Sequence, residues 1–125
     1  MPVFKTQLTE MLGIEHPIVC GGMTGTGMVE LTAAVSNAGC LGMLTALNFG
    51  TPENFAKAIE DTRKLTDKPF GVNLTILPSL NPPDYDAFAQ AIIDGGVKVV
   101  ETAGNNPKKA SGPARTIVAL TVAAY

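Results

Sequence analysis

Short apolar runs that lack polar alternation constrain the fold of this chain more than any other feature. A strand with one solvated face alternates apolar and polar residues, whereas a strand buried on both faces does not. Four such runs predict strands of a parallel sheet, near residues 18–22, 42–47, 70–76 and 97–102.

Amphipathic segments separate these runs and predict helices. In residues 26–38, apolar residues recur at helical spacing, and Gly39 is suited to end the helix. The next helix has Thr51 as a candidate N-cap and Pro52 at its first position. A third helix is expected after the proline-rich loop at 78–83. A helix after the fourth run is less well defined.

The strand–helix repeat with short connections fits two architectures. One is an open doubly wound sheet, and the other is part of a (β/α)8 barrel. Both place function at the carboxyl ends of the strands. In this chain those ends are residues 21–25, 46–50, 75–83 and 102–107.

The composition excludes several classes of function. The 125 residues suit one domain, and the net charge is -2 without a basic cluster, so neither nucleic acid nor an anionic membrane surface is an expected partner. No apolar run reaches the roughly 18 residues of a membrane helix, and Lys5 and Glu10 interrupt any signal peptide. Cys20 and Cys40 lack metal-type spacing, so we expect a cytoplasmic protein with free thiols and no metal.

The stretch GGMTGTG, residues 21–27, has four glycines among seven residues. Glycine at this density costs chain entropy on folding, so the fold must require residues without side chains at these positions. The stretch is neither a P-loop nor a dinucleotide fingerprint, because the required lysine and glycine spacings are missing. It is either an ordinary tight turn or a backbone held close to a flat or anionic ligand. Met23 within it is either a core residue or part of a site.

Polar residues also follow the third and fourth runs. Asn73 and Thr75 share one face of their strand, which in a barrel is the interior. They either hydrogen-bond inside the barrel or contact a polar cofactor. Glu101 is either a base or, as we favour, paired within the barrel. His16 precedes the first run, at the wrong end for catalysis, and is expected to be structural.

Four segments occur in an order that is familiar: GIEHPIVCGGM, ELTAAVSNAGCLGML, TDKPFGVNLTILP and GVKVVETAGNNP. Together they resemble the amino-terminal half of the nitronate monooxygenase family, formerly called 2-nitropropane dioxygenase, which includes a branch of NADH:quinone reductases. The resemblance covers about residues 3–108. It implies a parallel βα repeat that forms the amino-terminal half of a TIM (β/α)8 barrel. Residues 1–109 would be the partial barrel domain, and 110–125 an unmatched tail.

The resemblance also implies FMN as the cofactor. The implied contacts come from the glycine loop and from the third strand, at Gly22, Met23, Thr24, Thr75 and Asn73. The family's phosphate-binding strands and catalytic histidine lie in the second half of the barrel, and His16 does not replace that histidine. The resemblance therefore assigns no catalytic residue in this chain.

Two activities and one non-catalytic alternative follow from the resemblance. Family members oxidise alkyl nitronates with O2, whereas the sister branch reduces quinones with NAD(P)H. Pro78 and Pro82 match the pattern of the sister branch and would lie beside the substrate pocket. The alternative is a truncated half-barrel fragment that self-associates through its exposed strand edges.

Overall fold

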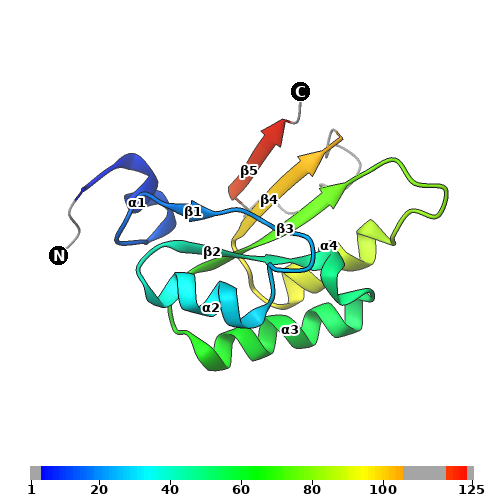
Figure 1. Ribbon diagram of the computed structural model, residues 1–125, viewed down its shortest axis with the longest axis horizontal. Coiled ribbons are helices and arrows are strands. Elements are labelled where there is room, and N and C mark those ends of the chain that lie inside the picture. The colour runs from blue at the N-terminus through cyan, green and yellow to red at the C-terminus, as the bar shows by residue number, and fades with distance from the viewer. Residues whose placement is uncertain (1–3, 106–117, 124–125) are drawn as a thin grey trace.

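The protein, in a computed structural model, forms one parallel sheet whose three longest described helices lie together on one face (Figure 1). The structure describes residues 4–105 and the strand at 118–123. The strands are β1 (Val19–Cys20), β2 (Leu41–Thr45), β3 (Phe70–Ile76), β4 (Val99–Gly104) and β5 (Val118–Ala123). The helices are α1 (Gln7–Leu12), α2 (Val29–Asn37), the 3-10 helix η1 (Ala46–Phe49), α3 (Pro52–Leu65) and α4 (Tyr85–Asp94).

The sheet order is β1-β2-β3-β4-β5, and each neighbouring pair is parallel. The predicted parallel βα repeat is therefore confirmed, and it has the half-barrel form. Residues of β2 are buried throughout, as are the first five residues of β3, as expected for strands covered on both faces.

The first strand departs from the prediction. The expected strand was 18–22, but β1 has only two residues, and both are half-buried. Ile18, just before it, is 56% exposed. The physical reason is position: β1 is an edge strand of the described sheet and pairs with β2 alone. Burial on both faces was therefore the wrong expectation for this run.

The main core lies between the sheet and helices α3 and α4. It joins strand residues such as Leu44 and Val72 to the helix residues Phe55, Ile59 and Phe88, which are almost fully buried. The rings of Phe55 and Phe88 lie 5.7 Å apart between centroids and tilt by 45°, a favourable aromatic arrangement. This packing fixes α3 against α4, and the two helices support β3 and β4 from one face of the sheet.

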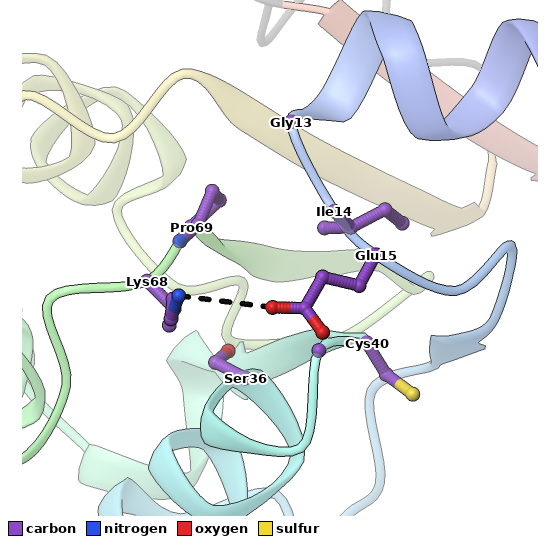
Figure 2. A pocket seen from close by; sticks show the side chains of 8 residues that line it. Gly13, Ile14, Glu15, Ser36, Cys40, Lys68 and Pro69 are labelled. Carbon is purple, nitrogen blue, oxygen red and sulfur yellow. Dashed lines mark ion pairs between the residues drawn. The ribbon is translucent and has the colours of Figure 1, made fainter. Parts of the chain in front are cut away.

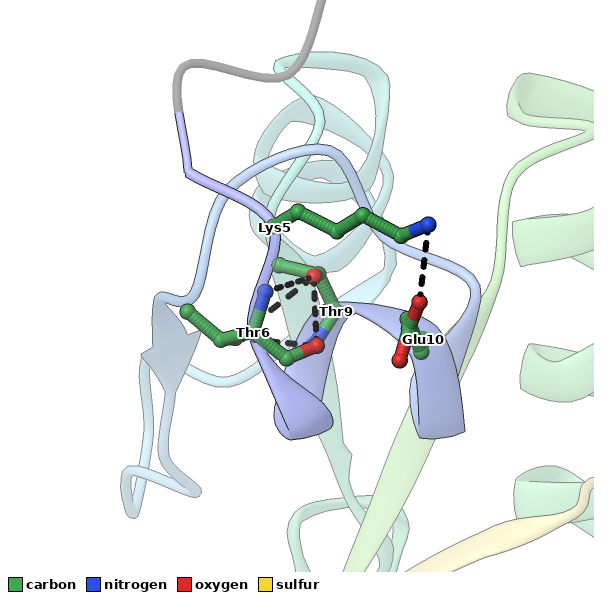
Figure 3. A network of polar contacts seen from close by, with 4 residues as sticks. All are labelled: Lys5, Thr6, Thr9 and Glu10. Atoms are coloured by element: carbon green, nitrogen blue, oxygen red, sulfur yellow. Dashed lines mark hydrogen bonds and ion pairs between the residues drawn. The ribbon is translucent and has the colours of Figure 1, made fainter.

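The opposite face of the sheet carries a second, smaller cluster. Leu12 and Ile14, at the end of α1, pack with Leu41, Met43 and Val99. Helix α1 was not predicted from the sequence, because six residues are too few to show a periodicity. The helix begins with reciprocal hydrogen bonds between Thr6 and Thr9, and Lys5 Nζ lies 3.1 Å from Glu10 Oε1 (Figure 3).

Two element boundaries differ from the prediction for identifiable reasons. Helix α2 begins at Val29 rather than at residue 26, because the preceding residues form a turn in which Gly27 N–H donates to the carbonyl of Met23. Strand β2 ends at Thr45, and η1 takes the place of the last predicted strand residues. The predicted cap of α3 is confirmed, since Thr51 Oγ1 accepts from Asn54 N–H.

Part of the predicted tail lies in the sheet. Residues 118–123 form β5, which pairs in parallel with β4. The helix that was expected after the fourth strand falls outside the described residues. The division of the chain at residue 109 stays a prediction.

Replacing Thr51 with alanine tests the cap of α3. The variant loses the acceptor for Asn54 N–H, and we expect a loss of about 1 kcal/mol in the free energy of unfolding. Urea denaturation should show a lower midpoint with an unchanged slope. Thr51→Ser keeps the hydroxyl and is the matched control. Equal stability of the alanine and serine variants would contradict the assignment.

Candidate functional site

A row of polar side chains crosses three neighbouring strands, at the end of β2 and in the middle of β3 and β4. The register pairs Thr45 with Asn73, and Asn73 with Glu101. All three are buried, with exposed fractions of 5%, 4% and 8%. Because side chains alternate across a strand, the row shares the sheet face that holds Met43 and Val99.

The glycine loop between β1 and α2 is bound directly to this row. Gly22 N–H donates to Glu101 Oε2 over 2.8 Å, and Met23 N–H donates to Thr45 Oγ1 over 3.0 Å. Asn73 Nδ2 donates to the same oxygen of Glu101, also over 2.8 Å. The loop is therefore tied to residues that follow it by 22 and 79 positions in the chain.

Close approach explains why the loop needs glycine. A Cβ atom at Gly22 would overlap the side chain of Asn73, and one at Gly27 would overlap Thr45 Oγ1. Gly25 has open space around it but adopts a φ of 75°, which other residues rarely adopt. The bare backbone is thus required by contact with the polar row and by one left-handed turn.

Most N–H groups of the loop already have a partner. Gly25 N–H donates to Asn48 Oδ1, while the N–H groups of Thr26 and Gly27 donate to the carbonyl of Met23. Asn48 Nδ2 also donates to that carbonyl. Phosphate binding needs several backbone N–H groups aimed at the anion. The loop is therefore poorly suited to an anionic ligand, and a flat, uncharged group is the better fit.

The side chains of Met23 and Thr24 are exposed at the turn of the loop. Met23 is 40% exposed, so it is not the core residue that one interpretation required. A thioether and a hydroxyl are therefore available to a ligand at this edge of the sheet.

Asn73 and Thr75 hydrogen-bond to each other, as one of the two interpretations expected. Thr75 Oγ1 donates to Asn73 Oδ1 over 2.9 Å, and Asn73 Nδ2 is taken by Glu101. Both ends of the buried Asn73 amide are thus used within the protein. Thr75 is half-buried, nearer the strand end. Glu101 is paired within the sheet, which is the interpretation that the sequence favoured over a base.

These contacts join most of the predicted site residues into one chain of hydrogen bonds. It runs from Gly22 through Glu101 and Asn73 to Thr75. Thr45 and Asn48 complete the attachment of the loop. Sequence reasoning singled out neither residue, although Asn48 lies within the predicted strand end at 46–50. The signal for Thr45 was a polar side chain at the end of a buried strand, and the register pairs it with Asn73 of β3. Asn48 lies in η1, which was not predicted.

The opposite end of the sheet holds a pocket of about 30 Å³ (Figure 2). It lies where the chain enters β2 and β3, and Cys40 and Ser36 are among its lining residues. Lys68 Nζ stands 3.8 Å from Glu15 Oε1 beside it. This volume suits one water molecule and is too small for a cofactor.

The remaining candidate groups for chemistry are few. His16 precedes β1, and its backbone N–H donates to the carbonyl of Gly39, in keeping with a structural role. Cys20 and Cys40 are both free. Among residues 4–105 and 118–123, no three His, Cys, Asp or Glu side chains are grouped to hold a metal ion. In the same described portion, no helix has the length and apolar character to cross a membrane.

Comparison with known proteins places this geometry in a family. The family model described as nitronate monooxygenase matches residues 5–119. The chain belongs to the nitronate monooxygenase family. The match extends past residue 109, into the segment that was expected to be an unmatched tail.

Individual relatives of the family have different names. A (3aS,4S,5R,7aS)-5-hydroxy-7a-methyl-1-oxo-octahydro-1H-indene-4-carboxyl-CoA dehydrogenase of Mycobacterium tuberculosis is 46% identical over 99 residues, which are 79% of this chain and 26% of that protein. A probable nitronate monooxygenase of Staphylococcus haemolyticus is 42% identical over 73 residues, or 58% of this chain and 20% of the relative. The chain thus spans about a quarter or less of these relatives.

A solved structure supports the same fold. FabK from Thermotoga maritima superposes with a TM-score of 0.84 at 36% identity, covering 95% of this chain and 37% of that one. The likeness extends over nearly the whole chain, so the half-barrel form is shared with a much longer member of the fold.

Replacing Gly22 with alanine tests the close approach of the loop to the sheet. The added methyl group would overlap Asn73, and we expect overpacking to cost about 1–3 kcal/mol in the free energy of unfolding. Thr24→Ala changes an exposed side chain of the same loop and should stay within about 0.5 kcal/mol of the parent. Denaturation of both variants in urea measures the difference. A Gly22→Ala variant as stable as Thr24→Ala would show that the loop does not contact the row.

Proposed function

We propose that this chain provides the flavin-ring side of an FMN-dependent oxidoreductase that oxidises alkyl nitronates with O2. The observation that carries the proposal is the convergence of the glycine loop and the end of β3 on one edge of the sheet. Hydrogen bonds connect Gly22 to Thr75 through two intervening side chains. These are the positions at which resemblance to the family implies cofactor contacts.

The residues present fit one part of the cofactor. A flat ring system can lie against bare backbone at Gly22, with Met23, Thr24 and Thr75 around it, because the loop leaves side chains exposed there. Asn73 would support these residues rather than bind the ring, since its amide is already used. The phosphate of FMN would need N–H donors other than those that the loop has committed.

The protein and the cofactor divide the work in this proposal. FMN, when bound, supplies the redox chemistry between nitronate and O2. The residues of this chain bind and orient the ring, and the buried polar row holds the loop in place. No residue of the described portion is assigned a proton transfer.

Reduction of quinones with NAD(P)H is the second candidate. The loop between β3 and α4 favours it, because this loop begins next to Thr75 and presents apolar side chains to solvent. Leu77 is 56% exposed and Leu80 is fully exposed. Pro78 and Pro82 restrict the backbone of this loop. Such a surface suits a substrate with a large apolar part, as a quinone has.

A chimera tests the activity while keeping a complete barrel. The aligned 73-residue segment of this chain would replace its counterpart in the S. haemolyticus relative. We expect the purified chimera to be yellow with bound flavin and to consume O2 when an alkyl nitronate is added. The unaltered relative is the matched control.

Three substrate arms separate the candidates. Nitronate-dependent O2 uptake supports the proposal, whereas quinone-dependent oxidation of NAD(P)H without nitronate activity supports the second candidate. An acyl-CoA arm is included because the M. tuberculosis relative is named for a CoA thioester. A folded chimera without flavin would contradict both candidates and would favour a non-catalytic half-barrel.

A further inference from the structure

We propose that Glu101 is a positioning residue, whose single oxygen Oε2 holds the glycine loop at the carboxyl edge of the sheet. The inference rests on the proposed function only in naming that edge as the cofactor face. The positioning itself is argued from the contacts of the described residues.

The first observation is that two donors share one acceptor atom. Gly22 N–H and Asn73 Nδ2 both donate to Oε2 of Glu101, each over 2.8 Å. Glu101 is 8% exposed, and the ion pairs of the described portion do not include it. A buried carboxylate without a cation is held by its hydrogen bonds, so removing them is costly.

The second observation is that the sheet alone does not place the loop. Strand β1 pairs with β2 through Val19 and Cys20 only, and it has no register partner in β3 or β4. The loop nevertheless reaches β4, and Gly22 lies close to the side chain of Asn73 in β3. In the described part of the chain, the contact that bonds the loop to β4 is the one from Gly22 N–H to Glu101.

The third observation is that two consecutive glycines leave room for this side chain. A Cβ atom at Gly21 would lie 3.1 Å from Oε1 of Glu101, and one at Gly22 would overlap Asn73. The bare backbone and the buried carboxylate therefore fit together. The pair Gly21–Gly22 is explained by Glu101 and Asn73 beneath it, before any ligand is considered.

Because one oxygen of Glu101 accepts both hydrogen bonds, substitutions that keep, move or remove this oxygen test its role. In Glu101→Gln the amide oxygen can take the place of Oε2 and accept from both donors, so the loop should remain in place. Glu101→Ala removes the acceptor, and Glu101→Asp draws it back by one methylene group. Geometry rather than charge is the property that we infer to matter.

The test is amide hydrogen exchange of the full 125-residue chain, read residue by residue. We expect Gly22 N–H to exchange about tenfold faster or more in Glu101→Ala and in Glu101→Asp. Its rate in Glu101→Gln should stay close to that of the parent. Met23 N–H, which is held by Thr45, is the internal control and should change less than Gly22. Glu101→Asp keeps the carboxylate and stands in for Glu101→Ala if the alanine variant unfolds.

The outcomes separate this proposal from the proposed function. Unchanged exchange at Gly22 in the aspartate and alanine variants would overturn the positioning role, whether or not flavin binds. Fast exchange in the glutamine variant would overturn the geometric explanation, because charge would then be decisive.

A parallel titration with FMN serves as the cofactor readout. Flavin binding that weakens in Glu101→Asp and is restored in Glu101→Gln supports positioning at the cofactor face. Changed exchange without any flavin binding by the parent would support positioning and contradict the cofactor assignment.

Discussion

The in-register alignment of β2, β3 and β4 is the constraint on which the site depends. It brings Thr45, Asn73 and Glu101 into one row, although they come from distant parts of the chain. The parallel register of the strands sets this alignment, because it places these three residues directly beside one another. The glycine loop is then fixed by the row rather than by its own strand, which is short and lies at the edge.

Polar residues at this depth are tolerable because each has a partner. Within the described residues, every buried side-chain nitrogen or oxygen has a hydrogen bond. Beneath the row, the apolar cores on the two faces hold the strands in place. The hydrogen bonds of the polar row are strongly coupled, because removing one side chain leaves its partners without a hydrogen bond. The stability of the sheet and the shape of the candidate site therefore depend on the same residues.

Much of the fold was readable from the sequence because its signals are local. Buried apolar runs predicted the parallel strands, and Thr51 marked the start of α3. The short helix α1 and η1 gave no periodic signal. The partial exposure of β1 depends on its edge position, which no local pattern reports. In the site, the shared face of Asn73 and Thr75 followed from strand alternation. The hydrogen bond from Gly22 to Glu101 joins residues far apart in the chain. It could be recognised only when the register of the strands was known.

The central claim is that the edge formed by the glycine loop and β3 receives an uncharged flat ring. Titration of the isotope-labelled chain with riboflavin, a flavin without phosphate, tests this most directly. Amide resonances in an NMR spectrum report contact even when binding is weak. The account predicts that the largest shifts fall at residues 22–24 and at Thr75. Shifts confined to the amino-terminal end of the strands, around Cys40 and Lys68, or no shifts at saturating riboflavin, would contradict it.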